Sequence, residues 1–596
     1  MKKREEISST DKWNVEALYP TLEEWKKALS QITDQPSTPH WPKLVLLQGR
    51  LKEGPEVVKE VLELSFSISR ELKKLYTYAH LRHDEEITDN LHKQVFEQIT
   101  SLIYDFQEEC AWIEPELLEL ETSTIETYLQ SPLLSPYRFH IEKIVRMRPH
   151  TLTADKEKLI TMATKPLQTI PKTFSALNNA DIKLGHVKDQ TGKEQELSHG
   201  LYALYLRSQD RVLRKNAFKG MHEKYQDLEN TMAELLFGKV QDHVFNATAR
   251  QYPSALEAAL FPKKIPTSVY YSLIKAVREG LPLLHRYVNI RKERLNLDEI
   301  HLYDLYAPLV PHADIKMDYD RAQKLVIQSV APLGTDYQSA LEEGLIEKRW
   351  VDRFENKNKR SGAYSSGCFD SFPYILMNYR GILRDVFTLA HEAGHSMHSY
   401  LSNQTQPYHY ADYPIFVAEV ASTFNEELLS HLLLKETPKK EERLFLVNEK
   451  IEDIRATLFR QTMFAEFELK MHELVEAHQP LTPTLLKEIY HQLNVDYFGP
   501  DIVIDPEIAI EWARIPHFYY NFYVYQYATG ISAAFALVEK VLQGDQTARE
   551  NYLQFLKGGA SLFPVDLLKL AGVDITTPRP IQAILRKFES LLNNLA

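Results

Sequence analysis

The sequence has few cysteines, few glycines and no long apolar run. Only two of its 596 residues are cysteines, far fewer than a secreted disulfide framework needs. Its 20 glycines are about half the usual share of ~7 %, which is typical of helical chains. No window reaches the ~18 consecutive apolar residues of a membrane helix, and no apolar stretch follows the basic N-terminus as in a signal peptide. We therefore expect a soluble, cytoplasmic protein.

An excess of positive charge is also absent. The chain carries 70 Lys and Arg against 82 Asp and Glu, a formal net charge of −12. Binding to nucleic acid or to an anionic membrane needs concentrated basic residues, so we expect neither as a partner. The proportions of hydrophobic residues, 44 %, and charged residues, 26 %, are those of a globular protein. The oligomeric state stays open.

Helical periodicity dominates the chain, and we predict a mainly α fold. Apolar residues recur at steps of three and four from residue 13 to about 174, as on the buried faces of amphipathic helices. One such stripe comprises Val57, Val61, Leu64, Ile68, Leu72 and Leu75. A predicted small hairpin around Thr191 and Gly192 interrupts the pattern. We place a domain boundary there, between residues 1–195 and 196–596, and predict a strand at Tyr374–Tyr379.

The segment His391-Glu392-Ala393-Gly394-His395 has the pattern H-E-x-x-H within a predicted helix spanning about 382–401. Positions four apart lie one turn apart on the same helix face, so both imidazoles can reach one metal ion. Neutral imidazole suits zinc, and catalytic zinc sites have three protein ligands and one open position. Glu392 lies beside that face, where it can contact a water molecule on the metal. His398 belongs to the same polar stripe as His391 and His395, and the stripe is expected to face a polar cleft.

Glu419 is the candidate third ligand. It follows His395 by 24 residues in a helical segment whose apolar positions recur at steps of four. A carboxylate among apolar residues needs a partner, and a metal ion provides one. Glu426 and Ser422 share the face of Glu419 at helical spacing. An ordinary exposed glutamate is the alternative.

Five tyrosines lie within nine residues near the C-terminus, in the segment 515–530. A buried phenol needs a hydrogen-bond partner, so some of these tyrosines are expected to line a polar groove. If the segment is helical, Tyr520, Tyr523 and Tyr527 share one face. His517 and a tyrosine could donate hydrogen bonds to an oxyanion. Aromatic packing is the alternative for most of them.

Taken together, these segments resemble the M3 zinc metallopeptidases, and within that family the oligoendopeptidase F group. The thimet oligopeptidases of the same family are more distantly similar. The similarity spans nearly the whole chain and rests on four segments: Trp13–Pro20, Gly362–Tyr379, the His391 to Glu419 region and His517–Gly530.

The resemblance implies a two-lobed helical zinc endopeptidase whose deep channel admits only short unfolded peptides. It implies one Zn²⁺ per chain, with His391, His395 and Glu419 as ligands. Zinc would activate its bound water as the nucleophile, with Glu392 as general base. In this interpretation residues 1–195 form part of the channel wall and residues 196–596 form the catalytic domain.

The resemblance also implies roles for residues outside the metal site. His517 and Tyr527 would contact the oxyanion or the substrate, with Tyr520 and Tyr523 as further substrate contacts. The spacing from His517 to the last tyrosine is shorter than in the thimet oligopeptidases, and Val524 stands where another tyrosine is expected.

The loop and strand 362–379, including Gly362 and Tyr364, would hold the substrate as an added β-strand.

Two other functions stay open. The pairs Glu392/His395 and Glu488/His491 match the Glu-x-x-His pattern of a di-iron helical bundle, which would bind two irons instead of one zinc. The chain could also be a helical binding protein with an inactive site, although every proposed site residue is present.

Overall fold

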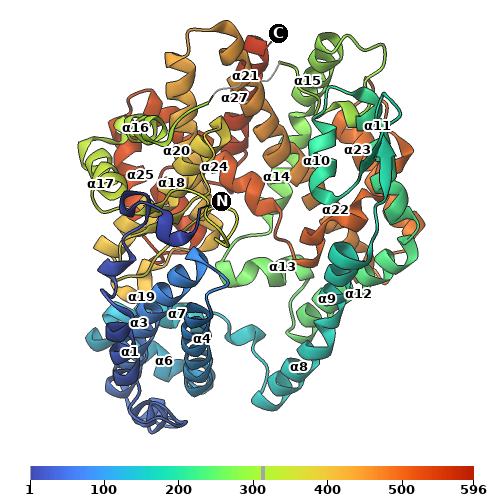
Figure 1. The fold of residues 1–596 in the computed structure, drawn as a ribbon. Coiled ribbons are helices and arrows are strands. Elements are labelled where there is room, and N and C mark those ends of the chain that lie inside the picture. Colours follow the sequence, from blue (N-terminus) through green and yellow to red (C-terminus); the bar gives the residue numbers. More distant parts are fainter. Residues whose placement is uncertain (1, 311–315, 596) are drawn as a thin grey trace. The chain divides into compact units, whose positions relative to one another are not determined.

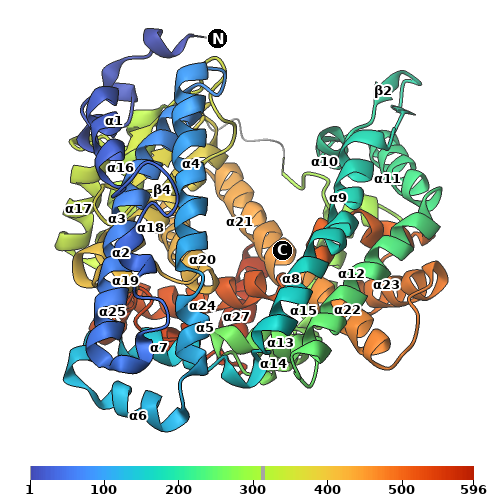
Figure 2. The ribbon, with the colours of Figure 1, turned by 90° about the horizontal axis from the view of Figure 1, so that it is seen from below.

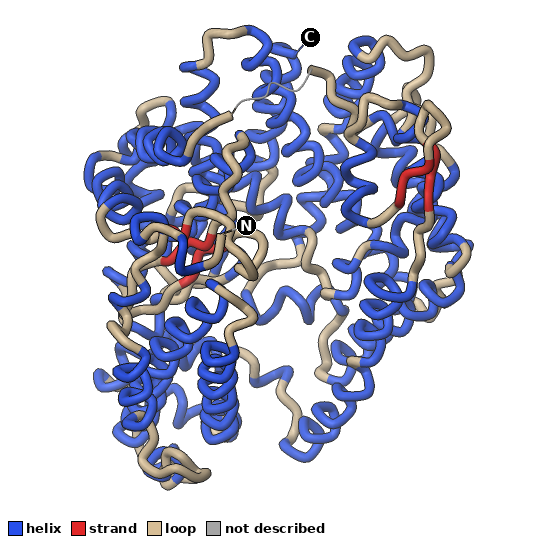
Figure 3. The backbone as a smooth tube through the Cα atoms, in the orientation of Figure 1, coloured by secondary structure: helices blue, strands red, loops and turns tan. Residues whose placement is uncertain are grey.

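Helices make up most of the protein, as the sequence predicts. The structure is a computed structural model that describes residues 2–310 and 316–595, and strands occupy only short segments of it (Figure 3). Within these residues, no helix has both the length and the apolar character needed to cross a membrane.

The chain forms two compact units, each assembled from three separate segments. Unit 1 comprises Met1–Pro149, Ile315–Leu432 and Leu537–Gly572, and unit 2 comprises His150–Asp314, Leu433–Ala536 and Val573–Ala596. A unit boundary falls inside α20 (Ile415–Glu436) and another inside α24 (Tyr525–Leu542). The predicted boundary at 195/196 lies within unit 2 and stays a sequence-level prediction.

The other helices of unit 1 (labelled in Figure 1) are α1 (Leu22–Gln31), α2 (Pro42–Val45), α3 (Pro55–Glu85), α4 (Asn90–Cys110), α5 (Ile113–Glu119), α6 (Thr122–Gln130), α7 (Arg138–Val145), α16 (Tyr319–Ser329), α17 (Thr335–Ile346), α18 (Leu383–Thr405), α19 (Tyr408–Ala411), α25 (Gln546–Lys557) and α26 (Pro564–Leu570). The other helices of unit 2 are α8 (Ala154–Leu167), α9 (Thr169–Ala176), α10 (His199–Leu206), α11 (Arg211–Gln226), α12 (Glu229–Ala249), α13 (Ala255–Leu260), α14 (Ser268–Glu279), α15 (Leu281–Arg294), α21 (Lys440–Ile454), α22 (Gln461–Glu476), α23 (Pro483–Phe498) and α27 (Arg579–Leu595).

Helix α3 shows how the periodic apolar pattern becomes a core. Pro55 occupies its first turn, where a missing N–H costs nothing. Of the predicted stripe, Val61, Ile68, Leu72 and Leu75 are buried, and Val57 and Leu64 pack against the same core. Helix α4 runs beside α3 (Figure 2). The stripe prediction is confirmed.

The strands form two small sheets. In unit 2, β1 (His186–Lys188) pairs antiparallel with β2 (Glu194–Glu196), which confirms the predicted hairpin. In unit 1, β3 (Val351–Asp352), β5 (Tyr374–Leu376) and β4 (Tyr364–Ser366) form a sheet in the order β3-β5-β4. The central strand β5 is the beginning of the predicted strand 374–379. Strand β4 is therefore an edge strand with one unpaired side.

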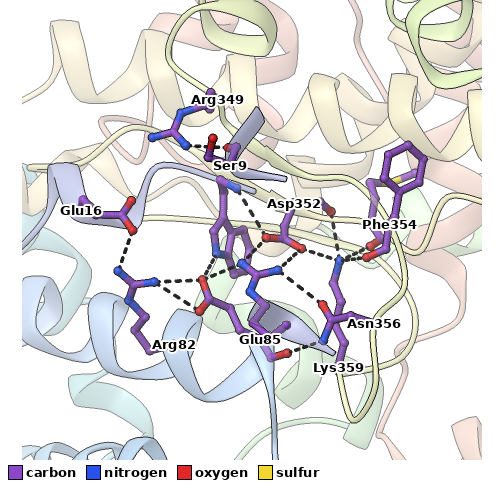
Figure 4. Close-up of polar contacts among 12 residues, drawn as sticks. Ser9, Glu16, Arg82, Glu85, Arg349, Asp352, Phe354, Asn356 and Lys359 are labelled. Atoms are coloured by element: carbon purple, nitrogen blue, oxygen red, sulfur yellow. Dashed lines mark hydrogen bonds and ion pairs between the residues drawn. The ribbon is translucent and has the colours of Figure 1, made fainter. Parts of the chain in front are cut away.

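A buried network of charges joins the N-terminal segment to this sheet (Figure 4). The Asp352 carboxylate on β3 accepts hydrogen bonds from both terminal nitrogens of Arg4, at 2.8 and 2.5 Å, and from Lys359 Nζ at 2.6 Å. Glu85, at the end of α3, accepts a hydrogen bond from the Trp13 indole N–H at 2.6 Å and forms an ion pair with Arg4 at 2.9 Å. The network holds the end of α3 and the N-terminal segment against the sheet.

Candidate metal centre

Helix α18 places His391 and His395 one turn apart, as the motif predicts. Its first turn is fixed by Asp385, whose carboxylate accepts hydrogen bonds from the backbone N–H groups of Arg380 at 2.6 Å and Ile382 at 3.4 Å. An aspartate in the first turn also interacts favourably with the helix dipole. The helix continues well beyond the motif, which therefore lies in a rigid part of it.

Gly394 allows α20 to approach α18 closely. A Cβ at this position would lie 2.6 Å from the Ala421 carbonyl oxygen and 2.7 Å from the Ser422 Cα, distances that no side chain tolerates. The contact is with the backbone of α20, which cannot rotate away. The glycine between the two histidines therefore brings Glu419, on α20, within reach of them.

The three predicted ligands come together. His391 Nε2 lies 3.2 Å from His395 Nε2 and 3.4 Å from Glu419 Oε2, and His395 Nε2 lies 3.6 Å from Glu419 Oε2. Ligand atoms at 2.0–2.1 Å from a tetrahedral zinc are separated by roughly 3.3 to 3.4 Å. The donor set of two imidazoles and one carboxylate, and its spacing, fit zinc. Among residues 2–310 and 316–595 this is the one His/Cys/Asp/Glu group with such spacing.

Two further side chains orient these ligands. The Ser422 hydroxyl donates to Glu419 Oε2 at 2.9 Å, and Glu426 Oε1 lies 2.5 Å from His391 Nδ1. When His391 Nδ1–H donates to Glu426, Nε2 is left free to bind a metal. The sequence placed Glu426 on the face of Glu419 but gave it no role. The available signal was its position two turns after Glu419.

Glu392 is buried beside the ligands, with 7 % of its surface exposed. Burial raises its pKa to about 7, although the nearby His391 opposes the shift. The backbone N–H of Ser365, on β4, donates to its carboxylate. A glutamate with a pKa near neutrality can accept and return a proton at physiological pH.

The two histidines differ in proton affinity. Burial lowers the pKa of His391, but its hydrogen bond to Glu426 and the Glu426 charge outweigh this and raise it to about 9. Burial, followed by the charge of His391, lowers the pKa of His395 to about 4. The nearby carboxylates therefore stabilise a proton on His391, at the atom that faces Glu426.

His398 does not face the site. The helical pattern placed it on the polar stripe with His391 and His395, but it is 1 % exposed. Its ring stacks on Tyr413 at a centroid distance of 3.6 Å, and burial lowers its pKa to about 3. The prediction for His398 is wrong because Tyr413, in the segment before α20, and Phe555, on α25, pack against its ring.

Strand β4 lies against α18. The hydroxyls of Ser365 and Ser396 are 2.8 Å apart. Tyr364 donates its hydroxyl to Asp84 Oδ2 at 2.8 Å, so its side chain is held within the protein. Gly362 has φ +86°, a conformation that favours glycine, and its carbonyl accepts from Asn378 Nδ2 at 2.8 Å. The main chain at the edge of β4 is therefore the part available to a peptide.

A cavity of about 400 Å³ opens beside β4 within unit 1. Ser365 and Ser366 line it from the strand, Asn403 from α18 and Ala418 from α20. It is large enough for a side chain of a peptide that lies along the strand.

The tyrosine segment belongs to unit 2 and is not helical throughout. A short 3₁₀ turn, Pro516–Tyr519, ends before Tyr520, and α24 begins only at Tyr525. Asn521 and Phe522 lie between them with φ values of 50° and 55°. The condition under which Tyr520, Tyr523 and Tyr527 share a helix face is therefore not met.

The tyrosines nevertheless gather, because the loop folds back on itself. Ring centroids of Tyr523 lie 6.3 Å from Tyr520 and 5.5 Å from Tyr527. Tyr527 Oη is 3.5 Å from His517 Nε2. Glu468, fully buried on α22, accepts the backbone N–H of Phe522 at 2.6 Å. No pattern in the sequence predicts this contact.

Comparisons with known proteins identify the class. The sequence model described as "Peptidase family M3" matches residues 204–587, and the one described as "Oligopeptidase F" matches residues 116–183. The chain belongs to peptidase family M3, as its motifs indicated, and it is a peptidase.

Relatives within that family are similar over nearly the full length. Oligopeptidase PepF of Bacillus subtilis is 44 % identical, covering 99 % of this chain and 88 % of its own. An oligoendopeptidase F homolog of Lactococcus lactis is 38 % identical, covering 100 % and 98 %. Among solved structures, a Chlamydophila abortus protein is 45 % identical with a TM-score of 0.95, covering 100 % and 99 %. Oligoendopeptidase F from Enterococcus faecium is 35 % identical with a TM-score of 0.72, covering 96 % and 97 %.

The di-iron alternative loses its support. Glu488 and His491 lie on α23 in unit 2, and within the described part of the chain they belong to no group spaced for a metal ion. His391, which that alternative left unused, is part of the group that does exist.

Proposed function

We propose that this protein is a zinc-dependent endopeptidase that hydrolyses internal bonds of short, unfolded oligopeptides. The observation that carries the proposal is the spacing of 3.2 to 3.6 Å among the ligand atoms of His391, His395 and Glu419. One zinc ion per chain would be held by these three residues. When bound, zinc supplies Lewis acidity that activates a water molecule and polarises the scissile carbonyl.

Glu392 is the proposed general base. It takes a proton from the attacking water and later delivers it to the leaving amine nitrogen, which balances the proton over the reaction. Its burial supports this role, because the pKa of about 7 suits both uptake and release near neutral pH.

Glu426 is the proposed positioning residue for His391. Its carboxylate accepts the Nδ1 proton, which fixes the tautomer and directs the other nitrogen to the metal.

The edge of β4 is the proposed binding site for the substrate backbone. A peptide added as a further strand would pair with main-chain groups on the open side of β4 other than the Ser365 N–H, which donates to Glu392. Gly362 and Tyr364 would contribute through their main chain, since the Tyr364 hydroxyl is engaged by Asp84. Adding a strand requires an extended peptide, which supports unfolded substrates.

His517 and Tyr527 are proposed to donate hydrogen bonds to the oxyanion, with Tyr520 and Tyr523 as substrate contacts. Their grouping within unit 2 supports a common role, and Tyr520 is 56 % exposed. The division into an N-terminal region, 1–195, and a catalytic region, 196–596, is part of the same proposal.

Cleavage of a quenched fluorescent peptide, beside a folded protein substrate, tests the proposal. We expect 1,10-phenanthroline to abolish peptide cleavage, zinc to restore it, and the folded protein to remain intact. Cleavage that persists after complete metal removal would overturn the zinc requirement.

Glu392→Gln tests the base directly. Loss of a general base lowers the rate typically ~100- to ~10,000-fold, and we expect kcat to fall in that range while one zinc per chain remains bound. Glu355→Gln, at an exposed position remote from the ligands in sequence, is the matched control. Full activity in Glu392→Gln would exclude the assignment.

A further inference from the structure

A second cavity lies within unit 2, lined by residues that the peptidase mechanism does not use. It encloses about 200 Å³, room for roughly half a dozen water molecules at ~30 Å³ each. Four arginines and one glutamate are the charged residues of its wall: Arg207, Arg455, Arg460, Arg514 and Glu511.

An unusual backbone segment directs two of these arginines into the cavity. Residues Arg455–Arg460 form the π-helical turn η11 between α21 and α22. In an α-helix, residues five apart point roughly 140° away from each other, whereas the i to i+5 pattern of a π-turn brings them toward one side. Arg455 and Arg460 are its first and last residues, and both line the cavity. Such turns are rare and occur frequently at functional sites.

Positive charge exceeds negative charge around this cavity. Glu511 Oε1 accepts from both Arg460, at 2.8 Å, and Arg514, at 2.6 Å. Glu452 similarly pairs with Arg455 at 2.7 Å and is also approached by the buried Arg291 at 3.4 Å.

Glu511 and Glu452 are therefore the only two carboxylates among these contacts, and they pair with four buried or half-buried guanidinium groups. Arg207 adds a fifth at an exposed position of the wall, and Arg514 Nε is buried with no hydrogen-bond partner among the described residues.

The pKa of Tyr306 indicates the sign of the electrostatic potential in the cavity. Its ring lies 4.6 Å from the Arg455 guanidinium carbon, and the side chain lines the cavity. Burial by itself raises the pKa of a tyrosine, but here Arg460 and Arg455 outweigh burial and lower it. The cavity therefore stabilises a negative charge.

We propose that this cavity binds a phosphate group, either free or carried by a small ester. Guanidinium groups match the oxygens of phosphate with paired, charge-assisted hydrogen bonds. Aromatic side chains of Tyr202, Phe218, Tyr306 and Phe498 form other parts of the wall, so an ester with an aromatic group would gain additional contact. The site is distinct from the metal centre, which lies in unit 1.

Calorimetric titration of the full-length protein with inorganic phosphate and with phenyl phosphate tests the proposal, with chloride at matched ionic strength as the blank. We expect saturable binding of one anion per chain. Tight binding of inorganic phosphate would indicate a free anion, and a clear preference for phenyl phosphate would indicate an ester.

Two variants and one control test whether the anion binds in this cavity. Arg514→Gln keeps Glu511 paired through Arg460, and Arg207→Gln alters an exposed side chain, so the second variant remains informative if the first does not fold. A lost charge-assisted hydrogen bond weakens binding about tenfold or more, and we expect this in both variants. Lys193→Gln, on the exposed β1–β2 turn of the same unit, removes one charge elsewhere and should bind as the unaltered protein does. The proposal would be overturned if phosphate binding does not saturate, or if Lys193→Gln weakens the binding as much as the arginine variants do.

Discussion

The two ring nitrogens of His391 face different partners, and one of those partners, Glu426, is not among the proposed metal ligands. Nε2 faces His395 and Glu419, while Nδ1 faces Glu426. A carboxylate behind a histidine ligand fixes the ring and strengthens the ligand as a base. At the proposed zinc site, the affinity for zinc is therefore expected to depend on Glu426.

Glu426→Gln is expected to weaken zinc binding by 10- to 100-fold, the range typical for loss of such a partner. The amide keeps the shape of the side chain but not its charge. Competition with a chelator of known affinity measures the change, with Glu355→Gln as the control. Unchanged zinc affinity would contradict a positioning role for Glu426.

Tyr527 offers a test of the oxyanion proposal at the level of one hydroxyl. Removing one oxyanion donor costs roughly 100- to 1,000-fold in kcat, and we expect this range for Tyr527→Phe with zinc content unchanged. Tyr104→Phe, at a position 66 % exposed in unit 1, serves as the control. A change confined to KM would instead assign Tyr527 to substrate binding.

At the scale of elements, the proposed metal centre depends on how closely α18 and α20 pack. The two histidines come from one helix and the carboxylate from another, so small separations of the helices move the ligands apart. Gly394 sets the closest approach, because only hydrogen occupies the space beside the Ala421 carbonyl.

Gly394→Ala is expected to lower both zinc affinity and thermal stability, because the new methyl group must displace the backbone of α20. Overpacking of this kind typically costs ~1–3 kcal/mol. Gly200→Ala, in α10, has no atom within 4 Å of the new Cβ and should be neutral or slightly stabilising. Chelator competition and calorimetric melting of both variants provide the measurements. Unchanged zinc affinity in Gly394→Ala would show that the helix separation is not limiting.

Strand β5 and the tyrosine segment differ in how far the sequence predicted them. Strand β5 begins where its apolar run begins, at Tyr374. The tyrosine segment carried a pattern that fitted a helix, yet Asn521 and Phe522 have positive φ. Glu468 holds the backbone there, and this contact comes from a helix 54 residues earlier in the chain.

At the scale of the molecule, unit 1 joins segments that are far apart in sequence. Arg4 and Asp352 are 348 residues apart, yet they form a bidentate ion pair that is joined by Lys359. The Asp352 and Lys359 side chains are 1 % and 0 % exposed. Loss of one partner would leave a buried charge without its counter-ion.

Asp352→Asn is expected to destabilise the protein by ~3–5 kcal/mol, the cost of breaking a buried ion pair. Burial raises the pKa of Asp352, but Lys359 and Arg4 outweigh it and hold the pKa below its usual value. This carboxylate therefore contributes stability at neutral pH that is lost as the pH falls through its folded pKa.

Denaturant unfolding of the wild type and Asp352→Asn at several pH values checks this. The stability difference should be constant near neutrality and should shrink only below about pH 4, near the usual aspartate pKa. Asp336→Asn, on α17 in the same unit, is the control. A difference that does not depend on pH would show that the Asp352 charge is not responsible.

The sequence by itself determined the helical class, the buried stripe of α3, the family and the three residues proposed as metal ligands, whose side chains the structure brings together. These follow from local regularities, because helical spacing puts residues three, four and seven apart on one face whatever surrounds the helix. Only the tertiary structure decided which groups meet those faces: Glu426 behind His391, the covering of His398, the backbone of α20 against Gly394, and the arginines around the second cavity. Such contacts join distant segments, and their pairing depends on packing that no local pattern encodes.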